Sequence, residues 1–330
     1  MLILGVESSC DETSVAIVKD GKEVLANVVL SQIDIHKKFG GVVPEVASRN
    51  HVYQVSLVFK EAFSKAGVKP EDIDVVGVTY GPGLIGSLLV GLTAAKTFCL
   101  IFNKPLVKIH HLAGHIYANA IEHDMSFPAI ALVVSGGNTE LVYMKDNYEF
   151  EIIGETYDDA VGESYDKVAR VLGLSYPGGP VIDKLARTGK PSYKLPTPHV
   201  DGFNFSFSGL KSAVINLVHN ETQRGNEINK ADLACSFQEV VTKVLVDKTF
   251  KACEKYNVKN IIVAGGVSAN SGLKERFNNE NTNNYNIAIP SIKYCTDNAA
   301  MIAVATYYNL QKKKDFADLS LNAYANLSLS

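Results

Sequence analysis

The chain is poor in cysteine, and its cysteines form no pattern typical of a zinc knuckle or a disulfide framework. The five cysteines are odd in number, widely spaced and include no Cys-x-x-Cys pair; they are Cys10, Cys99, Cys235, Cys253 and Cys295. Such spacing is typical of buried or free thiols in a reducing cytosol. The sequence therefore argues against a disulfide-stabilised secreted domain.

An excess of positive charge is also missing. Lysine and arginine total 32 against 35 aspartates and glutamates, which gives a formal net charge of −3. A dedicated nucleic-acid binder usually carries a basic excess. Any contact with RNA would thus need a partner protein or a local basic patch, and the densest basic run is Lys312–Lys314.

No targeting or membrane segment is predicted. The opening stretch MLILGVESSCDE has no basic n-region, and its apolar run ends at Glu7, which argues against a signal peptide. Residues 84–102 approach the length of a membrane span, but Lys96 and three polar residues interrupt them, which predicts a buried helix. We expect a soluble, cytoplasmic protein with no membrane partner.

The two commonest phosphate-binding patterns are absent, because no segment matches GxxxxGK[ST] or GxGxxG. Three other turns each follow an apolar strand, and they read GVESSCDET, VSGGNTE and VAGGVSAN. Backbone amides exposed at such turns are natural cradles for anions. Glu12 in the first turn, and Gly265 and Gly266 in the third, are therefore candidate cleft residues.

The order of predicted elements repeats along the chain. Three strands followed by alternating helices and strands occupy the first part, and the same order starts again near Pro128. We predict two lobes, residues 1–126 and 127–330, with an insertion at 154–230 and a last helix that packs back on the first lobe. Glycine turns at corresponding positions of two α/β halves are typical of the duplicated actin-like (ASKHA, ribonuclease-H-like) fold, whose ligand cleft lies between the lobes.

Three of the eight histidines lie within VKIHHLAGHIYA, residues 107–118. On a helix, His111 and His115 are four residues apart and share one face, whereas His110 and His115 are five apart and diverge. Two histidines at this spacing can bind one cation, although an exposed pair is more often solvated. The residues alone leave both interpretations open.

Eight motifs occur in the order seen in the tRNA threonylcarbamoyladenosine transferase (TsaD/Gcp) family, once described as O-sialoglycoprotein endopeptidases. They are GVESSCDETSVAIV, VTYGPGLIGSLLVG, HHLAGHIYA, VSGGNTELV, YDKVARVLGLSYPGGP, FSFSGLKSAV, VAGGVSAN and CTDNAAMIA. The resemblance is to the bacterial form and spans residues 2–306. One departure is Asn138, where bacterial relatives commonly have histidine, and it retains a side chain that forms hydrogen bonds.

The resemblance implies transfer of a threonylcarbamoyl group from threonylcarbamoyl-AMP to the exocyclic amine of the adenosine at tRNA position 37, beside the anticodon. It implies one divalent metal, Fe²⁺ in preference to Zn²⁺, bound by His111, His115 and Asp297. The residues implied to bind the donor, or ATP or ADP in its place, are Val134, Ser135, Gly136, Gly137, Asn138, Asp166, Gly179, Asp183 and Asn270. Implied partners are tRNA, an actin-fold paralogue (TsaB-like) and a P-loop ATPase (TsaE-like).

The implied chemistry is coherent. Two imidazoles and one carboxylate leave coordination positions open, as in iron(II) sites and catalytic zinc sites. A metal there would orient the donor and polarise it as a Lewis acid. Because the attacking group is an amine of the substrate, we predict no catalytic protein nucleophile.

Three other functions compete with this prediction. A zincin protease needs HExxH, but Leu112, Ala113 and Gly114 separate His111 from His115, and none of them can act as a base. A sugar or acetate kinase of the same fold would share the phosphate turns without requiring the histidine pair. A non-catalytic scaffold of the family would lack the metal histidines, which this chain retains.

Overall fold

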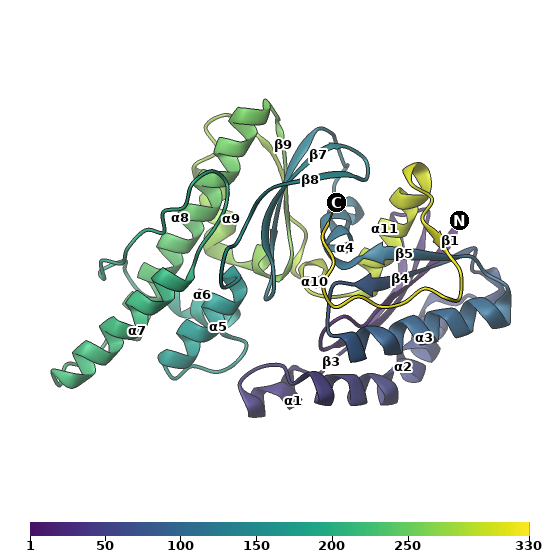
Figure 1. Cartoon of the computed structure of the whole chain (residues 1–330), viewed down its shortest axis with the longest axis horizontal. Coiled ribbons are helices and arrows are strands. Elements are labelled where there is room, and N and C mark those ends of the chain that lie inside the picture. Colours follow the sequence, from purple (N-terminus) through teal and green to yellow (C-terminus); the bar gives the residue numbers. More distant parts are fainter. Residues whose placement is uncertain (330) are drawn as a thin grey trace. The chain divides into compact units, whose positions relative to one another are not determined.

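A computed structural model describes residues 1–329, and the chain forms two compact units (Figure 1). Unit 1 comprises three segments, Met1–Phe127, Lys145–Phe150 and Pro290–Ser330. Unit 2 comprises Pro128–Met144 and Glu151–Ile289. The chain thus leaves unit 1, builds unit 2, and returns to unit 1 for its last forty or so residues.

Unit 1 contains a six-stranded mixed sheet in the order β11-β5-β4-β1-β2-β3. Its strands are β1 (Leu2–Glu7), β2 (Glu12–Lys19), β3 (Glu23–Ser31), β4 (Val75–Gly81), β5 (Leu106–His110) and β11 (Phe316–Ala317). Strands β1, β2 and β3 are antiparallel neighbours, whereas β4 is parallel to both β1 and β5. The turn between β2 and β3 contains Gly21 at φ +66°, a left-handed conformation that the sequence KDGK predicts.

Helices complete unit 1. They are α1 (Ile33–His36), α2 (Pro44–Ala66), α3 (Ile85–Phe102), α4 (His111–Ala118), α10 (Ile292–Cys295) and α11 (Ala299–Lys312), with short 3₁₀ turns η1 (Lys37–Phe39), η2 (Pro70–Asp72) and η3 (Asn119–Ile121). Helix α11 packs on β1 and β4 at a glycine pair, because Gly5 and Gly77 are opposite each other in the two strands. A Cβ atom on Gly5 would lie 2.2 Å from the carbonyl oxygen of Ala299, so this close approach requires glycine.

Unit 2 contains a five-stranded sheet in the order β10-β9-β6-β7-β8. Its strands are β6 (Ala129–Val134), β7 (Thr139–Asp146), β8 (Glu149–Glu155), β9 (Asn260–Ala264) and β10 (Asn286–Ala288). Its helices are α5 (Val161–Val171), α6 (Gly178–Ala186), α7 (Ser208–Gln223), α8 (Lys230–Tyr256) and α9 (Ser271–Asn279), with the 3₁₀ turn η4 (Gly266–Ala269). The core combines the apolar strands with the stripe Val161, Tyr165, Val168 and Leu172, which the sequence predicts for this region.

The two sheets share one topology. Strand order β3-β2-β1-β4-β5 in unit 1 corresponds to β8-β7-β6-β9-β10 in unit 2. In each unit the first strand pairs antiparallel with the second and parallel with the fourth. The duplication predicted from the order of elements is therefore present, and the fold is a duplicated α/β fold.

Helix α3 differs from the prediction that it would be buried. It is the one helix among residues 1–329 that is long and apolar enough to cross a membrane, which is weak evidence for a span. Its inner face, including Leu88 and Leu92, is buried in the core of unit 1, whereas Ile85 and Leu89 are exposed. The polar residues within this segment argued against a membrane span, but they could not show that only one face of the helix is buried.

Candidate functional site

The histidine helix α4 begins directly after β5, and His110 caps it. The Nδ1 atom of His110 accepts a hydrogen bond from the Leu112 amide at 3.1 Å, and its Nε2 atom lies 3.2 Å from the carbonyl oxygen of Leu327. Burial lowers the pKa of His110 to about 4, so its ring is neutral and its nitrogens serve these two backbone groups. The ring of His110 is thus directed away from the other two histidines, as the helical spacing predicts.

His111 and His115 lie together on one face of α4, with ring centroids 4.7 Å apart. Asp297 reaches them from the residue pair that precedes α11, where Asn298 caps the helix by accepting the Met301 amide. The Oδ1 atom of Asp297 is 3.1 Å from His115 Nε2 and 3.6 Å from His111 Nε2. One nitrogen or oxygen donor from each of the three residues falls within 4.8 Å of the others.

Charge is concentrated in this cluster. Burial opposes the charged form of His111, but the carboxylates of Asp297 and Glu7 outweigh it and raise the pKa of His111 to about 9. Burial also opposes ionisation of Asp297, but His111 and His115 lower its pKa to about 2. The cluster therefore attracts a positive charge, which is a proton in the absence of any other cation.

The donor set fits a divalent metal. Two imidazoles and one carboxylate on one side are the ligands that iron(II) and zinc share, and three protein ligands leave positions open for a substrate. Both histidines are buried and Asp297 is partly exposed, and the buried Nδ1 atom of His115 has no hydrogen-bond partner within the described part of the chain. Hydrogen bonding within the described residues therefore does not account for the burial of the His115 ring.

Glu12, the other candidate in unit 1, lies at the start of β2. Its carboxylate accepts a hydrogen bond from the Ser31 hydroxyl at 2.9 Å. Burial, together with the negative charges of Asp297 and Asp11, raises the pKa of Glu12 well above its usual value. Glu12 therefore belongs to the electrostatic surroundings of the cluster formed by His111, His115 and Asp297.

In unit 2, the turn Val134–Asn138 joins β6 to β7. The Ser135 hydroxyl accepts hydrogen bonds from the amides of Gly137 and Asn138 at 3.3 and 3.0 Å. A Cβ atom on Gly136 or Gly137 would meet no atom within 4 Å, so the turn presents open space. The Asn138 side chain donates to Glu140 at 3.2 Å, which shows that this asparagine is held within the turn.

The turn after β9 lies against the turn Val134–Asn138. Gly265 has φ +89°, and a Cβ atom on it would lie 2.3 Å from the carbonyl oxygen of Val134. Glycine is therefore required for the two turns to be side by side. A Cβ atom on Gly266 would meet nothing within 4 Å, so this position is open as well.

Asp183 and Asn270 are joined by Gln238, a residue of α8 that sequence reasoning did not identify. The Gln238 amide donates to Asp183 Oδ1 at 3.0 Å and accepts from Asn270 at 2.8 Å. Ser271 also donates to Asp183, and the Asn270 side chain caps α9 through the Leu273 amide. The sequence signal for Gln238 is its position: it is a polar residue within the apolar stripe of a long predicted helix.

Asp166 and Gly179 meet where α5 packs on the start of α6. Asp166 Oδ1 accepts the amide of Gly178 at 2.6 Å, and burial raises the pKa of this carboxyl. A Cβ atom on Gly179 would meet nothing within 4 Å, so the helix start is open. The structure thus places all nine candidate donor-binding residues in unit 2, in three groups: the turn Val134–Asn138, the pair Asp166 and Gly179, and the pair Asp183 and Asn270.

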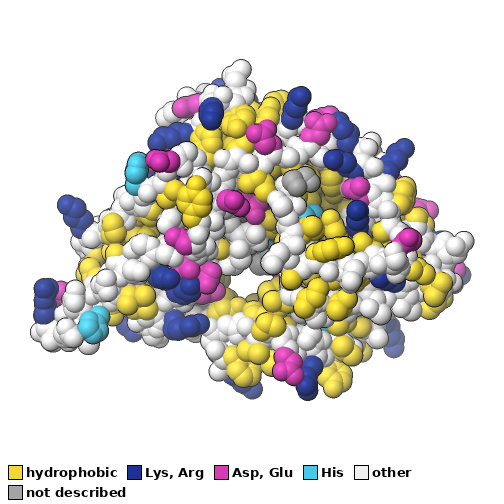
Figure 2. All heavy atoms as spheres, viewed as in Figure 1, with side chains coloured by type: hydrophobic (Ala, Val, Ile, Leu, Met, Phe, Trp, Pro, Cys, Tyr) yellow, Lys and Arg dark blue, Asp and Glu magenta, His cyan; other side chains and the backbone are white. Residues whose placement is uncertain are grey.

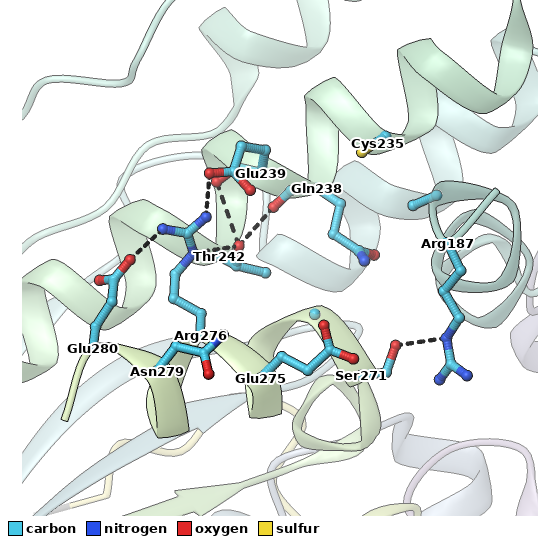
Figure 3. Close-up of a pocket in the computed structure, with 12 residues that line it drawn as sticks. Arg187, Cys235, Gln238, Glu239, Thr242, Ser271, Glu275, Arg276, Asn279 and Glu280 are labelled. Carbon is cyan, nitrogen blue, oxygen red and sulfur yellow. Dashed lines mark hydrogen bonds and ion pairs between the residues drawn. The ribbon is translucent and has the colours of Figure 1, made fainter. Parts of the chain in front are cut away.

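A pocket of about 420 Å³ opens beside the Gln238 network, between α6, α8 and α9 (Figure 3). Arg276 forms one wall and is fixed in place, because it is paired with both Glu239 and Glu280 and donates to the Thr242 hydroxyl at 3.0 Å. Ser271 and Gln238 line the same pocket. The pocket and the Asp183–Asn270 group are therefore neighbours.

The chain also resembles known proteins in sequence. A sequence model of the tRNA N6-adenosine threonylcarbamoyltransferase family matches residues 23–304. A protein of that name from Staphylococcus saprophyticus is 57% identical over 99% of this chain and 96% of its own length.

Two solved structures share the fold at low sequence identity. Full-length HypF in a phosphate- and nucleotide-bound form has a TM-score of 0.64 and 14% identity, over 94% of this chain and 47% of HypF. Component A of the Acidaminococcus fermentans (R)-2-hydroxyglutaryl-CoA dehydratase has a TM-score of 0.55 and 15% identity, over 94% and 100%. These likenesses identify the fold as actin-like. The sequence matches go further: the chain belongs to the tRNA N6-adenosine threonylcarbamoyltransferase family.

Proposed function

We propose that the chain transfers the threonylcarbamoyl group of threonylcarbamoyl-AMP to the exocyclic amine of the adenosine beside the anticodon of tRNA, in the cytoplasm. The observation that carries the proposal is the cluster of His111, His115 and Asp297 in a chain of this family. A divalent cation bound there, Fe²⁺ in preference to Zn²⁺, would supply Lewis-acid polarisation of the donor.

The residues of unit 2 bind and orient the nucleotide in this proposal. The open turn at Gly136 and Gly137 offers backbone amides to the phosphate, since nothing lies within 4 Å of where their side chains would be. Asp166, Asp183 and Asn270 supply acceptors and an amide for the nucleoside. Attack comes from the amine of tRNA, so positioning supplies the rate and no protein nucleophile is used.

Partner proteins share the recognition of tRNA in this proposal. Lys312, in the densest basic run, is paired with Asp146 and Glu149, which weakens the case that this run is a site for phosphate. The acidic net charge of −3 also favours a composite surface. A P-loop ATPase (TsaE-like) is the second partner we propose.

An exposed apolar surface on α2 and α3 supports docking of an actin-fold paralogue (TsaB-like). The two helices pack side by side, and hydrophobic side chains gather over them in the lower part of Figure 2. The exposed apolar residues there are Val52, Tyr53 and Leu57 of α2 and Ile85, Leu89, Leu100 and Ile101 of α3. Tyr53 is 78% exposed, and so many exposed apolar side chains are unusual unless another protein covers them.

The proposed function is tested by reconstitution. Purified protein is incubated with Fe²⁺, synthetic threonylcarbamoyl-AMP, unmodified tRNA and the two partner proteins, and the digested nucleosides are analysed by mass spectrometry. We expect threonylcarbamoyladenosine with the wild type and none with His111→Ala or His115→Ala. His219→Ala is the matched control, because His219 is exposed on α7 in unit 2. Equal product from all four proteins would contradict the metal-assisted reaction, and ATP-dependent phosphorylation of a sugar would favour a kinase.

A further inference from the structure

Glu7 is a buried carboxylate beside the metal cluster. It ends β1, is 1% exposed, and its two oxygens have different partners. Oε1 accepts the Ser9 amide at 2.6 Å, and Oε2 accepts the Thr79 hydroxyl at 2.5 Å. Oε2 also lies 3.3 Å from Nδ1 of His111, the ring nitrogen on the opposite side from Asp297.

An ionised carboxylate can only accept hydrogen bonds. In the neutral ring that binds a cation, a proton on Nδ1 of His111 therefore points at Glu7, and the lone pair of Nε2 is directed toward Asp297, 3.6 Å away. We propose that Glu7 is a positioning residue that fixes this protonation pattern and ring orientation of His111, so that Nε2 is the atom that binds the cation. The inference rests on the metal centre of the proposed function.

The balance of charge supports the same role. Glu7 is buried and Asp297 is partly exposed, and both carboxylates contact the imidazole pair; when both imidazoles are neutral, the two negative charges have no counter-charge. A buried charge without a partner is strongly destabilising, whereas one divalent cation cancels both. Glu7 thus completes a neutral site together with the three ligands.

Ser9 is the competing partner of His111. Its hydroxyl oxygen is 3.1 Å from the same Nδ1 atom, and a hydroxyl can either donate or accept. Ser9 is therefore compatible with both protonation patterns, whereas Glu7 is compatible with only one. Glu7 is therefore the residue that determines which nitrogen of His111 carries the proton.

The substitution Glu7→Gln should change which nitrogen of His111 is protonated, while the side chain keeps nearly the same size and shape. The Ser9 amide can only donate, so the carbonyl oxygen of the new glutamine stays opposite it. The NH₂ group then takes the place of Oε2 and donates to Nδ1 of His111, which moves the ring proton to Nε2 and blocks the cation. Removal of a partner of this kind typically lowers metal affinity by about 10- to 100-fold.

The test measures metal affinity by chelator competition with Zn²⁺, alongside ¹⁵N NMR of the histidine rings in Cd²⁺-loaded protein. We expect Glu7→Gln to weaken Zn²⁺ binding by about 10- to 100-fold, and Thr79→Val and Ser9→Ala to weaken it far less. In the wild type, Cd²⁺ should couple to Nε2 of His111, with Nδ1 protonated.

Each other result has a distinct meaning. Cd²⁺ on Nδ1 of His111 in the wild type overturns the inference without any variant. The same follows if Glu7→Gln binds Zn²⁺ as the wild type does, or if Ser9→Ala produces the larger loss. A wild type that binds no metal at these histidines overturns the proposed metal centre itself, and the role of Glu7 with it.

Discussion

Substitution of Gly5 by alanine should force α11 away from the sheet of unit 1. An added Cβ atom would lie 2.2 Å from the carbonyl oxygen of Ala299 and 2.8 Å from the amide nitrogen of Ala303. Ordinary contacts between such atoms begin near 3.4 Å. Both neighbours are backbone atoms, so no side-chain rotation can relieve the overlap, and the helix or the strand must move by about 1 Å.

The magnitude follows from the overlap. Overpacking of a close-packed core costs about 1 to 3 kcal/mol, and a clash with rigid backbone belongs at the upper end. A loss of about 3 kcal/mol should lower the melting temperature by roughly 6 °C in a chain of this size, at about 2 °C per kcal/mol. Because Asp297 lies two residues before Ala299, the displaced helix should also carry this ligand away from His115 and weaken metal binding.

Two measurements check the effect of Gly5→Ala: thermal unfolding followed by circular dichroism, and Zn²⁺ affinity followed by chelator competition. Gly209→Ala is the matched control, since Gly209 is in helix α7 and an added Cβ atom there would meet nothing within 4 Å. We expect the control to keep or slightly raise stability. A Gly5→Ala protein that melts and binds Zn²⁺ like the wild type would refute the reasoning.

Four further predictions concern the site. The pKa of His111, raised to about 9, makes its proton compete with the metal, so Zn²⁺ affinity should increase about tenfold per pH unit as the pH approaches 9; a flat profile between pH 7 and 9 would contradict this. Gly137→Val should weaken AMP binding in calorimetry without loss of stability, because the added atoms enter open space; unchanged affinity would remove the turn from the nucleotide site. Gln238→Leu should weaken AMP binding about tenfold, because Asp183 and Asn270 each lose one hydrogen bond and the side chain that joins them; normal binding would argue against this bridging role. His110→Ala should retain full metal stoichiometry but lose about 1 kcal/mol of stability with its helix cap; loss of metal would show that the assignment of ligands is wrong.

The regular elements were largely predictable because burial patterns in the sequence are strong. The apolar strands of both sheets and the long helix α8 follow directly from runs and stripes of hydrophobic residues. Helix α2 shows where this reasoning fails. The spacing of Val52, Val55, Phe59, Ala62 and Phe63 predicts that they share one apolar face of a helix that starts near Ser48. In the structure, however, Val52 is 59% exposed and His51 is buried. His51 bonds to Thr13 and to the Cys10 carbonyl, so polar contacts from a distant turn orient the helix.

The site was predictable only where its geometry is local. His111 and His115 share a helical face by spacing alone, but Asp297 is far away in the chain, and only the resemblance to a family connected it to them. Glu7 could not be identified from the sequence, because a glutamate after an apolar strand is usually read as the polar residue at which the strand ends. Its partner Thr79 is on β4, and only the parallel pairing of β1 with β4 places the two side chains together.

The discontinuity of unit 1 has a consequence for biosynthesis. A ribosome that has just released the histidine helix must still add all of unit 2 before Asp297 appears, which takes roughly 10 to 40 s at ordinary elongation rates. During that interval the nascent first sheet has no α11 to cover its glycine pair, and the imidazoles have no carboxylate from Asp297 beside them. The intervening unit has its own core and can fold first. Uptake of the proposed metal would therefore be among the last steps of maturation, and a truncated translation product that ends before residue 297 should emerge without the complete set of ligands.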